Sequence, residues 1–175
     1  MTRSGEDGRR VSLSPLDVCD EAGAGVWLPE AWAAIEGRKP ETSEPSTVTG
    51  LIEAVKLRWR DATIDRIEIA PHVFSGFTIW EDRHSEVVIR GLAIHRDQRN
   101  LGYGGEAVEW LETSSPNRRF VAAIPRQNGL AVYFWLRVGF RPFRADEDRE
   151  RSHDPDFLWM LRSAPPATTA AMSDP

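Results

Sequence analysis

The segment EVVIRGLAIHRDQRNLGYGGEAVEWL, residues 86–111, constrains the fold more than any other part of the chain. Residues 86–95 are rich in β-branched and apolar side chains, which predicts a strand buried on both faces. Residues 104–111 predict the first turns of a helix. A strand that leads through a glycine-rich loop into a helix can bind an anion, because the free N–H groups and the dipole of the helix point toward the loop.

Two phosphate-binding patterns compete for this loop. Gly102-x-Gly104-x-x-Ala107 formally matches the dinucleotide fingerprint, which would make the protein an NAD(P)-dependent enzyme. That fingerprint needs its first glycine almost directly after the strand and an acidic residue at the end of the next strand. Here seven residues, HRDQRNL, intervene, and the next predicted strand, residues 120–124, runs into Pro125. The second pattern is Arg99-x-x-Gly102-x-Gly104, and it extends beyond the loop.

Length and composition exclude several classes of protein. A chain of 175 residues fits one domain, which we expect at residues 10–163 with flexible tails at 1–9 and 164–175. A net charge of −5 argues against nucleic acid as the main partner. The single cysteine, Cys19, excludes an internal disulfide and a cysteine-rich zinc site, and we expect no metal. No apolar run approaches 18 residues and no signal peptide is evident, so we expect a cytoplasmic enzyme without a membrane partner.

The order of the predicted elements favours an α/β protein of the α+β type. Three consecutive strands at residues 63–70, 74–80 and 86–95, with a polar turn at 81–85, predict an antiparallel meander. This pattern counts against a doubly wound fold, in which strands alternate with helices. The other predicted strands are residues 10–14, 119–124, 140–144 and 157–161, and the helices are one begun by Pro15, 28–35, 48–59, 104–112 and one from the N-cap Asn128 to Gly139.

Two motifs resemble those of the GCN5-related N-acetyltransferase (GNAT) superfamily. Arg99-x-x-Gly102-x-Gly104 resembles motif A, Q/R-x-x-G-x-G/A, and the residues before it look like the fourth strand of the family. A second set resembles motif B, N-x-x-A-x-x-F-Y-x-x-x-G-F: Asn128, Ala131, Phe134 and Val138-Gly139-Phe140. The resemblance implies a GNAT fold, a mixed, mostly antiparallel sheet of about six to seven strands flanked by helices and splayed between strands 4 and 5.

The same resemblance implies acetyl-CoA as acyl donor, CoA as product, and transfer to an amine of a small molecule or peptide within a ternary complex. The alternative is a catalytically weak or inactive acyl-CoA-binding or regulatory module, and a homodimer is left open. Residues before the loop would pair with the pantetheine arm, and backbone N–H groups of the loop would hold the pyrophosphate. The implied cofactor-binding residues are Leu92, Ala93, Ile94, Arg99, Asn100, Leu101, Gly102, Tyr103, Gly104, Gly105 and Asn128.

The general acid is the main departure from the family pattern. The tyrosine thought to protonate the departing thiolate is replaced by Trp135, whose indole N–H is a far weaker acid. Tyr133 is the nearest phenol in sequence, but two residues on a helix turn the side chain by about 200°. We therefore predict that Tyr133 faces elsewhere and is not the acid, so that water serves instead.

The general base is assigned from the expected strand pleat. Glu86, Val88 and Arg90 are expected to share one face of the strand with Leu92, and Glu86 is the best candidate for the base. The alternative for Glu86 is a strand-end carboxylate in water, and His84 and Glu68 are weaker options. A weak base serves an acceptor amine of modest basicity, such as an α-amino group, better than a lysine.

Overall fold

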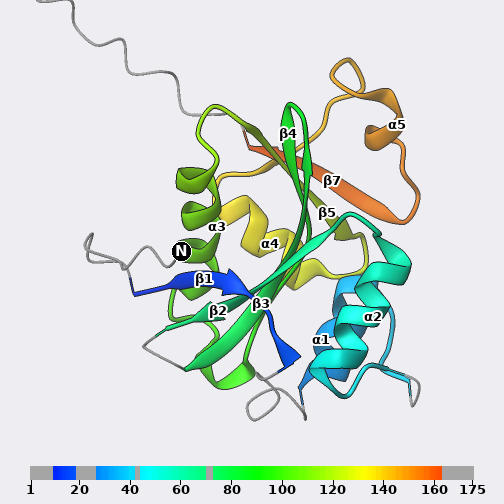
Figure 1. The fold of residues 1–175 in the computed structure, drawn as a ribbon. Coiled ribbons are helices and arrows are strands. Elements are labelled where there is room, and N and C mark those ends of the chain that lie inside the picture. The colour runs from blue at the N-terminus through cyan, green and yellow to red at the C-terminus, as the bar shows by residue number, and fades with distance from the viewer. Residues whose placement is uncertain (1–9, 19–26, 42–43, 70–72, 163–175) are drawn as a thin grey trace, which may run out of the picture.

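The protein forms one seven-stranded sheet with helices on both faces (Figure 1). The computed structural model describes residues 10–18, 27–41, 44–69 and 73–162, and the expected tails and Cys19 lie outside them. The strands are β1 (Ser12–Pro15), β2 (Thr63–Glu68), β3 (Phe74–Arg83), β4 (Glu86–Ile94), β5 (Arg119–Pro125), β6 (Arg141–Pro142) and β7 (Phe157–Arg162). The helices are α1 (Leu28–Glu36), α2 (Val48–Arg58), η2 (Arg96–Gln98), α3 (Tyr103–Ser114), α4 (Gly129–Arg137) and α5 (Arg149–Ser152).

The strand order is β1-β2-β3-β4-β5-β7-β6, and only β4 and β5 pair in parallel. All other neighbours are antiparallel, which confirms the predicted mixed, mostly antiparallel sheet. The parallel pair needs a crossover connection, and α3 supplies it. That residues 10–163 form a single domain stays a prediction.

Two apolar cores lie on opposite faces of the sheet. The buried residues of α3 and α4 share a core with Val87 and Ile89 of β4. The buried residues of α1 and α2 share the other core with Phe77 and Ile79 of β3. Figure 1 shows α3 and α4 on one side of the central strands, with α1 and α2 on the other. Among the described residues, no helix has the length and apolar content needed to cross a bilayer.

The sheet opens between β4 and β5, as the resemblance implies. Their pairing runs from Glu86 opposite Arg119 to Ile89 opposite Ala122 and then stops. Beyond Ile89, the second half of β4 pairs only with β3. Alternate peptide groups on that edge of β4 therefore have no strand partner, so another extended group can occupy the gap.

A β-bulge at Arg90 coincides with the end of this pairing. Ile79 and Trp80 are consecutive in β3, yet they face Gly91 and Ile89, so Arg90 is the extra residue. The bulge reverses the alternation of the pleat. The expectation that Glu86, Val88 and Arg90 share a face with Leu92 is therefore wrong, because it assumed unbroken alternation.

Helix α4 packs on the sheet through the half-buried Ala131, Phe134 and Val138 and through the buried Trp135. Asn128 caps it as expected, and its Oδ1 accepts a hydrogen bond from Ala131 N at 3.1 Å. Leu130 is 86% exposed, whereas Trp135 is 5% exposed. Trp135 packs against the rings of Phe134 and Phe140, with centroids 5.2 and 4.8 Å away. The indole ring of Trp135 therefore occupies the core, and the side chain of Leu130 faces solvent.

Several boundaries also differ from the prediction. β3 continues to Arg83, so Glu81 lies in a strand and not in the expected turn. Pro15 ends β1 instead of starting a helix. The charged run at 146–156 contains the short helix α5, and the expected strand at 140–144 is reduced to two residues in β6.

The orientation of α4 can be tested by paired substitutions. Trp135→Ala should lower the free energy of unfolding by about 3–5 kcal/mol, because it removes a large buried ring. Leu130→Ala on the same helix should change it by less than about 0.5 kcal/mol, because the side chain is exposed. Urea denaturation of both variants measures the difference, and a larger cost for Leu130→Ala would show that the helix is turned the other way.

Candidate active site

The loop between β4 and α3 has the backbone geometry of an anion site. His95 caps the short helix η2, and its Nδ1 accepts a hydrogen bond from Asp97 N at 3.4 Å. Asn100 and Gly102 then adopt positive φ angles of 64° and 92°. Only glycine adopts the φ angle of 92° without strain, so a side chain at Gly102 would distort the loop.

The first turn of α3 directs free N–H groups toward this loop. Gly102 is the N-cap, and its carbonyl accepts the first helical hydrogen bond, from Glu106 N at 3.1 Å. The N–H groups of Tyr103, Gly104 and Gly105 precede that bond and have no acceptor within the helix. Together with the helix dipole they favour a negatively charged group.

Gly104 also permits close packing between α3, α4 and β4. A Cβ atom at this position would lie 3.1 Å from the Phe134 ring and 3.4 Å from Leu92 Cδ2. Phe134 and Leu92 thus lie beside the first turn of α3, on the face of the sheet that α3 and α4 cover. Gly104 of the loop and Phe134 of α4 therefore meet at one place.

The side chains around the strand end have structural roles of their own. Arg99 Nε donates to the carbonyl of Ile94 at 3.0 Å, which folds the arginine back onto the end of β4. Ala93 belongs to the opposite core, with α1 and α2. Asn128 lies across the gap at the end of β5, where its Nδ2 donates to Ala34 O of α1 at 3.3 Å.

Arg10 is a cation at the loop that sequence reasoning missed. Its Nη2 donates to Leu101 O at 3.1 Å, and its Nε donates to Glu106 Oε1 at 2.9 Å. The guanidinium also lies 4.9 Å from the centre of the Tyr103 ring. Arg10 lies far from the loop in sequence, so no local pattern could have placed it there.

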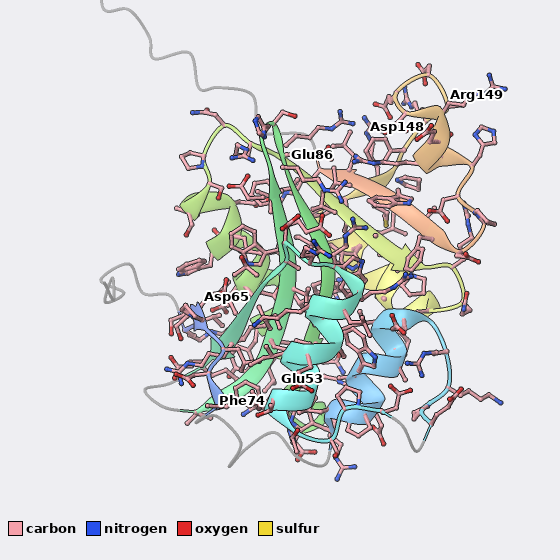
Figure 2. The ribbon with its side chains drawn as sticks, turned by 45° about the vertical axis from the view of Figure 1, so that its right-hand side comes forward. Glu53, Asp65, Phe74, Glu86, Asp148 and Arg149 are labelled. Atoms are coloured by element: carbon pink, nitrogen blue, oxygen red, sulfur yellow. The ribbon has the colours of Figure 1, made fainter. Side chains whose placement is uncertain are left out.

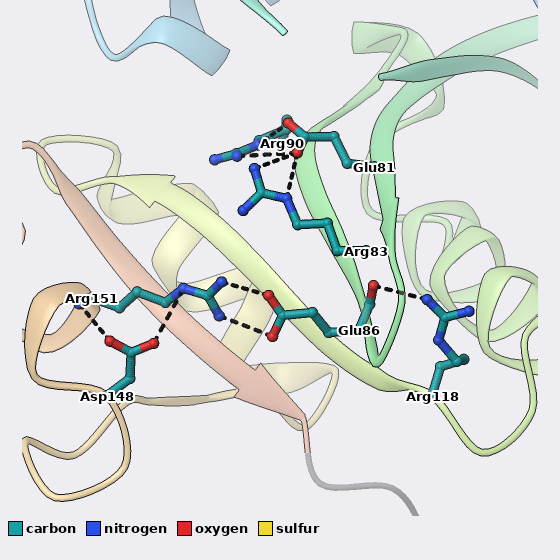
Figure 3. Close-up of polar contacts among 7 residues, drawn as sticks. All are labelled: Glu81, Arg83, Glu86, Arg90, Arg118, Asp148 and Arg151. Atoms are coloured by element: carbon teal, nitrogen blue, oxygen red, sulfur yellow. Dashed lines mark hydrogen bonds and ion pairs between the residues drawn. The ribbon is translucent and has the colours of Figure 1, made fainter. Parts of the chain in front are cut away.

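On the opposite face of the sheet, the bulged Arg90 lies between two tryptophan rings. Its guanidinium carbon is 5.9 Å from the centre of the Trp59 ring and 5.2 Å from that of Trp159. Arg90 Nε donates to Glu81 at 2.7 Å, and Arg83 Nε donates to the other oxygen of the same carboxylate at 2.7 Å (Figure 3). Burial alone would raise the pKa of Glu81, but the hydrogen bonds and charges of Arg90 and then Arg83 outweigh it and lower the pKa.

Glu86 is held by a different arginine. Both of its carboxylate oxygens accept from Arg151 of α5, at 3.0 and 2.5 Å (Figure 3). Arg151 also lies 3.4 Å from Asp148, so Glu86 shares its partner with a second carboxylate. Figure 2 shows Glu86 near α5, far from Phe74 at the other end of the sheet. Glu86 and the glycine-rich loop are therefore at opposite ends of β4.

Tyr133 and Trp135 lie in different environments on α4. Tyr133 is 62% exposed and packs against Arg137, whose guanidinium carbon is 5.9 Å from the ring centre. Trp135, at the position of the family tyrosine, is buried in the core. Within the part of the chain that the structure describes, no group of three or more His, Cys, Asp or Glu side chains could hold a metal ion.

Comparisons with known proteins give similarity at the level of structure alone. No protein-family model matches the chain, and no curated protein matches it either. Among solved structures, an acetyltransferase from Thermus thermophilus aligns with a TM-score of 0.65 and 16% identity, over 87% of this chain and 96% of that one. The PaiA N-acetyltransferase from Thermoplasma acidophilum, solved with coenzyme A, aligns with a TM-score of 0.62 and 14% identity, over 87% and 98%.

A third neighbour is a spermidine N-acetyltransferase from Vibrio cholerae in complex with CoA and spermine. It aligns with a TM-score of 0.55 and 14% identity, over 77% of this chain and 83% of that one. These neighbours and the strand topology confirm the fold that the two motifs predict. The chain has the fold of the GNAT superfamily, with the open parallel pair β4–β5 at its centre.

The buried pair of Glu81 and Arg90 predicts a pH-dependent stability. Because the pKa of Glu81 is lowered on folding, its stabilisation is complete above the unfolded value of about 4.3 and is lost as pH falls through the folded value. Glu81→Gln should cost on the order of 2 kcal/mol at pH 7 and progressively less below pH ~4. Urea denaturation at several pH values measures this, with Glu53→Gln on the exposed face of α2 as control. A cost for Glu81→Gln that does not change with pH would contradict the assignment.

Proposed function

We propose that the protein is an acetyl-CoA-dependent N-acetyltransferase that transfers an acetyl group directly to an amine. The observation that carries the proposal is the loss of β4–β5 pairing after Ile89 and Ala122, next to a glycine-rich loop that opens α3. The gap can take an extended chain with amide groups, and the loop can take a pyrophosphate. Acetyl-CoA has both parts, in that order. The solved neighbours that contain CoA or acetyl-CoA support the same cofactor.

The cofactor would contact residues on both sides of the gap. Peptide groups of Leu92, Ala93 and Ile94 would pair with the pantetheine arm in place of a strand. The N–H groups from Arg99 to Gly105 would hold the pyrophosphate, and Asn128 would border the arm from the β5 side. Arg10 would border the pyrophosphate at the edge of the loop, with its charge paired to that of Glu106. We infer no metal requirement.

The acceptor would approach from the face of the sheet that carries Arg90. Direct transfer needs a neutral amine, and both Glu81 and Glu86 accept hydrogen bonds from arginines. A carboxylate with a lowered pKa is a poorer proton acceptor, which argues against Glu81 as the base. Glu86 remains a proposed participant, but its contacts suit a group that orients α5 or the amine. We therefore propose that the proton leaves to solvent and that the acceptor is an amine of modest basicity.

A second candidate function is an acyl-CoA-binding module without efficient catalysis. The observation that favours it is Trp135, which fills the core at the position where the family has its tyrosine. CoA is a workable leaving group even so, because a free thiol has a pKa near 8.5 and its thiolate is therefore only a weak base that can depart before it is protonated. CoA release from acetyl-CoA with a panel of amines separates the two functions. Release with at least one amine supports the enzyme, and tight binding without release supports the module.

Substitution of the loop glycines tests the cofactor site. Gly102→Val and Gly104→Val should each weaken acetyl-CoA binding at least tenfold, about 1.4 kcal/mol, because a side chain strains the loop or meets Phe134. Isothermal titration calorimetry measures the affinity. Gly129→Ala is the control, since a Cβ atom there meets nothing within 4 Å. Unchanged affinity in folded Gly102 and Gly104 variants would remove the loop from the binding site.

The dependence of kcat/KM on pH tests the base. If the proton leaves to solvent, the profiles of wild type and Glu86→Gln should rise in parallel with the deprotonation of the amine. For an α-amino acceptor that rise centres near pH 7.7–8.0, and for a lysine-type amine near 10.4. A variant that loses rate mainly at neutral pH and recovers at higher pH would instead make Glu86 the base.

A further inference from the structure

A cavity lined by arginines lies at the end of the sheet opposite the glycine-rich loop. Its volume is about 530 Å³, and its lining includes Ser85 and the arginines 118, 119, 141 and 162. Ser85 immediately precedes β4, and the loop follows the other end of that strand. At about 3.3 Å per residue, the nine residues of β4 separate the cavity from the loop by roughly 30 Å. The cavity is therefore separate from the proposed acetyl-CoA site.

Three of the four arginines already have carboxylate partners. Arg118 pairs with Asp82, Arg141 pairs with Glu147 at 2.5 Å, and Arg162 pairs with Glu112 at 2.8 Å. Each pair leaves further guanidinium N–H groups, since one arginine carries five donors. Among the described residues that line the cavity, Glu147 is the only carboxylate.

Arg119 has no carboxylate partner among the residues that the structure describes. Its guanidinium carbon lies 4.9 Å from the centre of the Phe143 ring, which holds the group by a cation–π contact. The acidic residue opposite it along the ladder is Glu86, which faces Arg119 in the β4–β5 pair. Both oxygens of Glu86 are taken by Arg151. The positive charge of Arg119 is therefore not compensated within the described chain.

Two buried donors at the cavity lack acceptors. The Nε atoms of Arg118 and Arg119 are both buried and make no hydrogen bond among the described residues. A buried N–H group without an acceptor is unfavourable, and most such groups in proteins have a partner. The Nε atoms themselves are closed to solvent, so an anion in the cavity would reach the terminal N–H groups of the two arginines and compensate the charge of Arg119.

We propose that this cavity binds the phosphoryl group of a small phosphate monoester. Guanidinium groups match the geometry of phosphate oxygens through paired hydrogen bonds. A dianion also suits an arginine cluster better than a single carboxylate does. The cavity is larger than a free phosphate ion, so it has room for the organic part of a monoester. The proposal does not depend on acetyl-CoA binding at the other end of β4.

Thermal unfolding in the presence of defined anions tests the proposal. Inorganic phosphate and glycerol phosphate should raise the Tm of the wild type by about 3 °C at ten times the dissociation constant, compared with chloride at equal ionic strength. In Arg119→Gln, at least ten times more anion should be needed for the same rise in Tm. Arg119→Lys should weaken it less, because the charge remains while the paired geometry is lost. Arg60→Gln, at an exposed turn after α2, is the matched control and should behave as the wild type.

A further variant separates the cavity from the glycine-rich loop. Gly102→Val should keep the full response to phosphate if the anion binds at Arg119. Loss of the response in Gly102→Val, with an unchanged response in Arg119→Gln, would place the phosphate at the loop and overturn the proposal. An equal Tm rise in Arg119→Gln and wild type would overturn it as well. A larger rise in Tm with succinate than with glycerol phosphate would show that the cavity prefers a dicarboxylate, and it would overturn the phosphoryl proposal.

Discussion

The β-bulge at Arg90 is the constraint on which the rest of the candidate site depends. One extra residue in β4 bends the strand where its pairing with β5 ends, and it reverses the faces of the residues that follow. The reversed pleat turns Leu92 toward α3 and α4, while Arg90 faces Trp59 and Trp159. The two aromatic rings and Glu81 hold this arginine in place. These contacts stabilise the bulge at the point where β4 and β5 separate.

The opening divides the molecule into two chemically different sides. Toward α3 and α4 it meets glycines, a phenylalanine ring and the free N–H groups of a helix start. Toward α1 and α2 it meets arginines paired with carboxylates. Helix α1 packs against both β4 and β5, and Ile35 occupies the space where a side chain at Gly91 would lie, within 2.7 Å. Helix α1 therefore covers the second side of the gap next to Gly91.

The sequence predicted the sheet and the glycine-rich loop because both rest on local chemistry. Each of these signals determines the structure of residues close to it in sequence. They are the alternation of the strands, the N-cap Asn128 and the glycines at 102 and 104. The site beyond the loop depends on distant contacts. The bulge at Arg90 has no local signal, and it overturned the face expected for Leu92. Likewise, nothing near Glu86 in sequence indicates that Arg151 binds both of its oxygens, or that Arg10 reaches the loop.

The central claim is that acetyl-CoA binds in the gap with its pyrophosphate at the start of α3. Backbone amide chemical shifts of the labelled protein, followed by NMR during titration with acetyl-CoA, test it most directly. The account predicts the largest changes at the amides from Arg99 to Gly105, with smaller ones along Leu92–Ile94 and at Asn128, and little change at Arg119. Changes confined to the arginine cavity, or no change at saturating acetyl-CoA, would contradict it.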